Sequence, residues 1–141
     1  MNKKYTKNIK ANEIDRKWHL INAKGQILGR LAVEISSLLS GKKKIAYSSN
    51  MDIGDFVVVI NSEKINVTGK KFEDKKYHHY SGYPGGLKTK TFANVMAGKP
   101  EKIIYQAVKG MLPKNRLQDA RLKRLKIYKG DKHPHSAQFK K

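Results

Sequence analysis

The densest group of side chains suited to chemistry lies between residues 77 and 88. It reads Tyr77-His78-His79-Tyr80-Ser81-Gly82-Tyr83-Pro84-Gly85-Gly86-Leu87-Lys88, with further cations at Lys70, Lys71, Lys75, Lys76 and Lys90. Aromatic faces stack on unpaired bases, lysines neutralise phosphates, and glycines let a sugar–phosphate chain approach the backbone. The combination favours RNA binding, and its glycines and proline predict a loop without regular structure.

The alternative for this segment is a solvated loop whose tyrosines pack on the rest of the domain. The net charge argues for the first interpretation. The 141 residues include 31 Lys+Arg and 11 Asp+Glu, which gives a formal charge of +20 at pH 7. A charge of one sign and this size favours binding to polyanions even without sequence specificity.

A second cationic region lies in the last third of the chain. Residues 99–141 carry half of the net charge, and Asp119 is the only acidic residue between Lys102 and Lys129. The basic residues in that interval are Lys109, Lys114, Arg116, Arg121, Lys123, Arg124 and Lys126. An ordinary solvated helix would pair such cations with acids. We therefore expect a surface that faces phosphates.

Other chemistries find less support in the sequence. Gly82 and Lys88-Thr89 come close to the spacing of a phosphate-binding P-loop, but Leu87 stands where the second glycine is needed. Four histidines, His78, His79, His133 and His135, are a weak metal signal in a chain without cysteine. No nucleophile motif is present. The sequence thus predicts no enzymatic activity, no cofactor, no metal and no small-molecule substrate.

The compartment is predicted from cysteine usage and hydropathy. The chain has no cysteine, which fits a reducing cytoplasm. Residues 1–17 are charged throughout and lack the apolar stretch of a signal peptide, and no run approaches the roughly 18 to 20 apolar residues that span a bilayer. We expect a cytoplasmic protein without a membrane partner.

The elements that position these groups begin with a strand, a helix and a second strand. Residues 18–23 alternate as in a strand, and Lys24-Gly25 is a plausible turn. From residue 28 the apolar positions share one helix face, up to a stop at Ser40-Gly41 with Lys42, Lys43 and Lys44 beside the negative end of the helix dipole. Residues 56–60 are an apolar run typical of a buried parallel strand. This βαβ unit predicts the α/β class.

The remainder of the chain predicts mainly helices. Residues 91–97, 101–111 and 117–124 have helical patterns, and residues 125–128 suit a last strand. We expect a single domain over residues 1–141, with a core at about 15–128, a basic N-terminal extension at 1–14 and a tail at 129–141 that has little means of folding alone.

Several ordered motifs resemble a known family over nearly the whole chain. They are Trp18 with Ile21-Asn22-Ala23-Lys24-Gly25, Leu28-Gly29-Arg30-Leu31-Ala32, Gly41-Lys42, Asp52-Ile53-Gly54-Asp55, Val57-Val58-Val59-Ile60-Asn61, Lys64-Ile65, Thr68-Gly69-Lys70-Lys71, the segment Ser81 to Lys88, Ala107 to Asn115, Leu125-Lys126-Ile127-Tyr128 and His133-Pro134-His135. In these motifs the chain resembles the bacterial form of protein thirteen of the large ribosomal subunit.

The resemblance implies a three-layer α/β/α fold around a small, mostly parallel sheet, with basic terminal extensions. It also implies a structural protein without enzymatic activity, which binds large-subunit rRNA early in assembly beside neighbouring large-subunit proteins. The alternative is a free regulatory protein that binds mRNA. The candidate RNA-binding residues are Lys42, Lys43, Lys44, Lys70, Lys71, Tyr77, His79, Tyr80, Ser81, Gly82, Tyr83, Gly85, Gly86, Lys88, Lys109, Lys114, Asn115, Arg116, Arg121, Lys123, Arg124, Lys126, His133 and His135.

Overall fold

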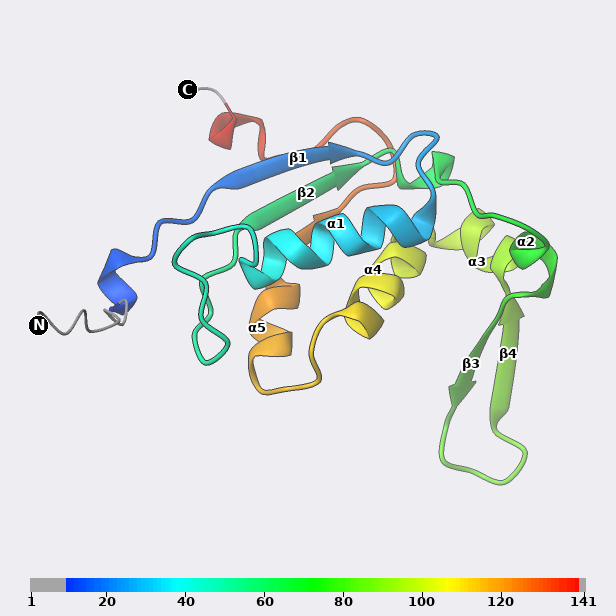
Figure 1. Ribbon diagram of the computed structural model, residues 1–141. Helices are drawn as coiled ribbons and strands as arrows, with labels where there is room; N and C mark the ends of the chain where they lie inside the picture. The colour runs from blue at the N-terminus through cyan, green and yellow to red at the C-terminus, as the bar shows by residue number, and fades with distance from the viewer. Residues whose placement is uncertain (1–9, 140–141) are drawn as a thin grey trace, which may run out of the picture.

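The computed structural model describes residues 10–139, so residues 1–9 of the expected N-terminal extension lie outside it. Figure 1 shows a helix-covered sheet and a separate hairpin that projects from one end. The elements are η1 (Ala11–Glu13), β1 (Trp18–Asn22), α1 (Leu28–Ser40), β2 (Phe56–Ile60), η2 (Ser62–Lys64), α2 (Lys71–Asp74), β3 (Lys76–Tyr80), β4 (Leu87–Thr91), α3 (Phe92–Gly98), α4 (Pro100–Met111), α5 (Leu117–Lys123), β5 (Leu125–Ile127) and η3 (Ser136–Gln138).

The main sheet is parallel, with strand order β1-β2-β5. Trp18 pairs with Phe56 at the start of β1 and β2, and Val57 pairs with Leu125 at the start of β5. The unbroken apolar run of β2 follows from its central place, because both of its faces are covered. The predicted α/β class and parallel sheet are confirmed.

Helix α1 covers one face of this sheet, as its apolar spacing predicts. Its apolar face is buried, and α1 packs against α4. Gly41 ends the helix in the left-handed conformation, with φ at +76°, and its N–H donates to the Leu38 carbonyl oxygen at 3.1 Å. Val57 and Val59 of β2 join this core, together with Ile103 and Ile104 of α4.

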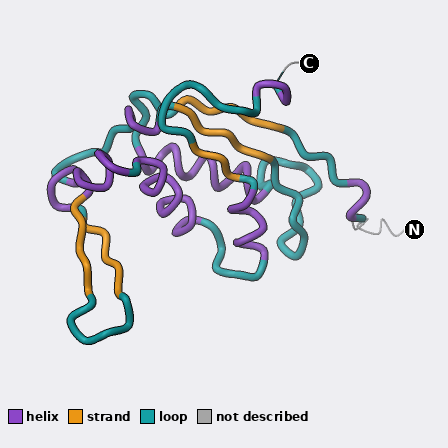
Figure 2. Tube along the Cα trace, turned by 180° about the vertical axis from the view of Figure 1, so that it is seen from behind, coloured by secondary structure: helices purple, strands orange, loops and turns teal. Residues whose placement is uncertain are grey.

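The C-terminal segment lies against Trp18 and Phe56, at the start of β1 and β2. The rings of Trp18 and Phe56 stack with centroids 4.4 Å apart, and His135 and Phe139 contact Trp18 at 5.3 and 6.3 Å. Figure 2 shows the same strands from behind. The tail that offers little means of folding alone is therefore docked through aromatic contacts, with η3 as its regular part.

A buried ion cluster joins the loop before β2 to α5. Asp52 receives two hydrogen bonds from the Arg124 guanidinium, and its Oδ1 lies 3.6 Å from Nε of Arg121. Burial raises the pKa of Asp52, but the hydrogen bond and charge of Arg124, and then the charges of Arg121 and Arg16, outweigh burial and hold this pKa below its ordinary value. The carboxylate is therefore ionised in the folded protein.

Gly54 lies where this loop crosses α1. A Cβ at this position would meet the Leu39 carbonyl oxygen at 1.7 Å and its carbon at 2.4 Å. Neither backbone can move far, because Asp55 N–H donates to the Leu38 carbonyl oxygen at 3.1 Å. Only glycine fits this crossing.

We expect Asp52→Asn to lower the free energy of unfolding by about 3–5 kcal/mol, because it leaves two buried guanidinium groups without an anion. Urea denaturation followed by Trp18 fluorescence measures this. Above about pH 5 the Asp52 carboxylate is ionised in both the folded and the unfolded state and contributes its full stability, and it loses this contribution as the pH falls through the unfolded pKa of about 3.9 and then the lowered folded pKa. Wild type should therefore lose more stability between about pH 5 and pH 2 than the variant. Asp131→Asn, an exposed control, should behave as wild type in both tests.

We expect Gly54→Ala to destabilise the protein by at least about 1–3 kcal/mol, since the added methyl group collides with the α1 backbone. Gly98→Ala is the matched control: Gly98 is also helix-associated, and its Cβ would meet nothing within 4 Å. The control should keep or slightly raise the melting temperature. Equal melting temperatures for the two variants would contradict the crossing argument.

Candidate RNA-binding surface

The segment from residue 77 to residue 88 forms a hairpin, so the prediction of a loop without regular structure is wrong. β3 and β4 pair antiparallel, with His78 opposite Thr89 and Tyr80 opposite Leu87. His78 Nδ1 and Thr89 Oγ1 lie 2.9 Å apart across the pair. Polar residues occupy both faces of these strands because both faces meet solvent, which removes the alternation that marks a half-buried strand.

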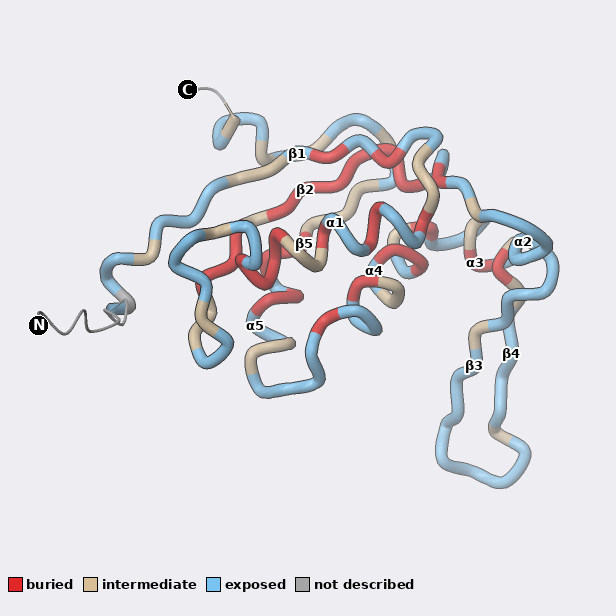
Figure 3. The backbone as a smooth tube through the Cα atoms, in the orientation of Figure 1, coloured by how far each residue is buried: buried red, intermediate tan, exposed pale blue. Residues whose placement is uncertain are grey.

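The hairpin tip presents aromatic side chains to solvent. Tyr80 is 61% exposed and Tyr83 is 77% exposed. Gly82 and Gly85 have φ of +93° and +71°, and the Gly86 N–H donates to the Tyr83 carbonyl oxygen at 2.9 Å. The glycines thus serve the turn itself. In Figure 3 nearly the whole hairpin is exposed.

The base of the hairpin is anchored to the core through Phe92. This fully buried ring lies 6.5 Å from the ring of Tyr77, and the Phe92 N–H donates to the Lys75 carbonyl oxygen at 2.8 Å. Thr91 caps α3 by accepting from the Asn94 N–H at 3.4 Å. Tyr77 is therefore half-buried at the base, whereas His79 and Lys88 are exposed further out.

A second exposed cationic group lies where α4 turns into α5. Lys109, Lys114, Asn115 and Arg116 are all exposed there. Gln118 holds the turn, because its amide nitrogen donates to the carbonyl oxygens of Lys109 at 3.0 Å and Leu112 at 3.2 Å.

Two expected phosphate contacts lie in the interior instead. Arg121 is 1% exposed and Arg124 is 7% exposed, and both are paired with Asp52. Their placement on a phosphate-facing surface is wrong, because α5 directs this side inward toward the loop before β2. Lys123 remains exposed and Lys126 is half-buried.

The other candidates divide into exposed and internally paired residues. Lys44 lies 2.5 Å from Asp55 and also donates to two backbone carbonyl oxygens. Burial raises the pKa of Asp55, but hydrogen bonds from Lys44, the Lys17 N–H and His19 outweigh burial and lower it. The His135 ring is hydrogen-bonded to the Tyr128 hydroxyl at 2.9 Å. Exposed members of the candidate set are Lys42, Lys43, Lys70, Lys71 and Ser81; Gly86 and His133 are half-buried.

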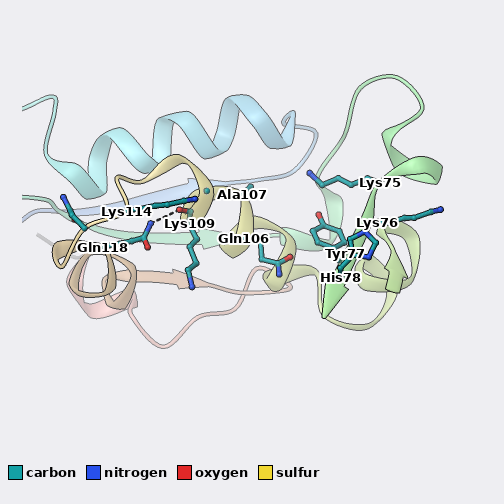
Figure 4. A pocket seen from close by; sticks show the side chains of 11 residues that line it. Lys75, Lys76, Tyr77, His78, Gln106, Ala107, Lys109, Lys114 and Gln118 are labelled. Atoms are coloured by element: carbon teal, nitrogen blue, oxygen red, sulfur yellow. Dashed lines mark hydrogen bonds between the residues drawn. The ribbon is translucent and has the colours of Figure 1, made fainter. Parts of the chain in front are cut away.

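A groove of about 760 Å³ lies between the hairpin base and α4, and we call it the hairpin–helix groove. It is lined by Lys75, Lys76, Tyr77, His78, Gln106, Ala107, Lys109, Gly110, Lys114, Asn115 and Gln118. Figure 4 shows the hairpin residues at one end and Lys109, Lys114 and Gln118 at the other. Sequence reasoning missed Gln106, Ala107 and Gln118 as site residues. The only signal was the small pair Ala107 and Gly110, spaced by about one helical turn.

Two properties of residues 10–139 bear on other functions. In this part of the chain no three acidic, histidine or cysteine side chains gather as a metal site would require. None of its helices has the length and apolar character needed to cross a bilayer.

Comparison with known proteins matches this chain over most of its length. A family model described as "Ribosomal protein L13" matches residues 16–134. The large ribosomal subunit protein uL13 of Caldanaerobacter subterraneus is 55% identical over 129 residues, which cover 92% of this chain and 90% of that protein. The uL13 of Aquifex aeolicus is 56% identical over 133 residues, covering 94% and 92%, and that of Geobacter sulfurreducens is 50% identical over 135 residues, covering 96% and 94%. A match of this extent and identity shows that the chain belongs to the ribosomal protein L13 family.

Proposed function

We propose that this chain is a structural constituent of the large ribosomal subunit that binds large-subunit rRNA and supports early subunit assembly in the cytoplasm. The observation that carries the proposal is the family match over residues 16–134, together with relatives named as large-subunit proteins. The family is structural and not enzymatic, and its partners are rRNA and other ribosomal proteins. The net charge of +20 supports an RNA partner.

The contact surface that we propose has two parts. One is the hairpin, with the exposed aromatic residues Tyr80 and Tyr83 at its tip and Lys88 on β4. The other is the α4–α5 turn with Lys109, Lys114 and Arg116. Lysines at these places would neutralise phosphates, and the exposed rings would stack on unpaired bases. Lys42, Lys43, Lys70, Lys71 and Lys123 extend this surface; Arg121 and Arg124 do not belong to it.

We propose a single domain with a folded core and two flanking segments. A core at about residues 15–128 carries the contact surface, and the extension 1–14 and the tail 129–141 flank it. Residues up to 139 of that tail contribute His133 and His135, whose rings pack against Tyr128.

We expect this chain to sediment with the large subunit at close to one copy per particle. The measurement is a sucrose gradient of a cell lysate, a high-salt wash of the large-subunit fraction, and quantitative mass spectrometry of the washed particles. A structural constituent is retained because its cations are buried against rRNA. Recovery of the chain mainly outside ribosomes, bound to mRNA, would instead identify the free regulatory protein.

The triple variant Lys109→Ala, Lys114→Ala and Arg116→Ala should bind large-subunit rRNA more weakly than wild type. The slope of log affinity against log salt should flatten by roughly 0.7–0.9 for each lost phosphate contact. Filter binding across a salt series measures both quantities. The control removes three exposed cations outside the proposed surface, Lys24, Lys99 and Lys102. Equal slopes for the two triple variants would remove the α4–α5 turn from the interface.

A further inference from the structure

We propose that the hairpin–helix groove receives a single unpaired RNA base, displaced from its helix, with its flanking phosphates on the lysines at the two ends of the groove. The inference rests on the proposed function, since it names the part of rRNA that this site recognises. The groove's volume of about 760 Å³ lies in the range of pockets that hold a small ligand.

Two of the α4 residues that line the groove, Ala107 and Gly110, have little or no side chain. Ala107 and Gly110 lie on the same side of α4, because residues three apart are neighbours on a helix. A Cβ at Gly110 would meet nothing within 4 Å, so the space above this residue is open. A flat floor over about one helical turn fits a planar ring better than the branched side chains of a peptide.

Two polar atoms in the groove's lining residues lack partners within the described chain. The Tyr77 hydroxyl and the Gln106 side-chain oxygen are both buried without a hydrogen bond. Burial raises the pKa of Tyr77, so the hydroxyl keeps its proton and can donate. The Gln106 oxygen can accept. Tyr77 and Gln106 both line the groove, and a nucleobase edge, which offers acceptors and donors together, is the kind of partner that each of these atoms lacks.

The charges around the groove select an anion. Lys75 and Lys76 lie on the hairpin side and Lys109 and Lys114 on the helix side, and none of the lining residues is acidic. Lys75 also lies over the Tyr77 ring, with its Nζ 5.6 Å from the centroid. Cations gathered without acids repel one another until an external anion screens them. Phosphates on both sides of a displaced nucleotide meet that requirement.

The test fills the groove without removing a cation. Gly110→Leu places a side chain over the floor, and its backbone is helical, so the substitution is compatible with α4. Gly98→Leu is the matched control, since Gly98 is also exposed and open. Full-length variants are bound to purified large-subunit rRNA, and thermal unfolding followed by circular dichroism checks that both fold.

We expect Gly110→Leu to weaken rRNA binding by about tenfold or more, with a smaller change of the salt slope than in the Lys109, Lys114 and Arg116 triple variant, because the stacking contact is lost while every cation remains. Chemical probing with a reagent that modifies unpaired base edges should find one base that wild type and Gly98→Leu protect and Gly110→Leu leaves reactive. Unchanged affinity, or weaker binding with no such base, would overturn the proposal. If wild type itself does not bind the rRNA, the proposed function fails instead.

Discussion

The ion cluster of Asp52 with Arg121 and Arg124 is the constraint on which the rest of the structure depends. Moving a guanidinium into a protein interior costs several kcal/mol, so these arginines stay inside only because the carboxylate meets them there. Arg124 follows α5 and directly precedes β5, which pairs with the central strand. One anion thereby fixes both the third strand of the sheet and the helix before it. The α4–α5 turn, with its exposed cations, takes its position from that helix.

The basic residues of this protein therefore fall into two groups, those in internal ion pairs and those exposed to solvent. A few form ion pairs inside the fold: Lys44 pairs with Asp55, and Arg124 pairs with Asp52. Most of the others are exposed and have too few acidic neighbours to pair with. Salt screens these internal ion pairs only weakly, whereas the exposed cations repel one another over a Debye length of about 10 Å at 0.1 M salt. Phosphates of a bound RNA would screen that repulsion. RNA binding would thus stabilise an arrangement of like charges that the protein alone does not neutralise.

The sequence predicted those elements whose side chains face a core and left out those whose side chains do not. The apolar spacing of α1 and the run in β2 are direct consequences of burial, and both elements appeared with their predicted bounds. The hairpin strands β3 and β4 are held by backbone pairing, so their sequence shows no alternation of apolar and polar residues from which a strand could be predicted. Arg121 was misplaced for a different reason: in a chain with 31 basic residues, nothing local distinguishes an inward cation, and its partner Asp52 is distant in sequence. Ala107 and Gly110 line the groove only because the fold brings the base of the hairpin opposite α4.

Helix α4 sets the separation between the two cationic groups. It begins at Pro100, directly after α3, whose Phe92 anchors the hairpin, and it ends at Met111, where Gln118 holds the turn to α5. Twelve residues of α-helix measure about 18 Å, and a helix packed against α1 does not stretch. The hairpin and the turn are therefore presented at a fixed distance, with the groove between them. On the proposed contact surface, an RNA that engages both groups would have to offer phosphates at that spacing, and its folded shape would then matter more for recognition than its base sequence.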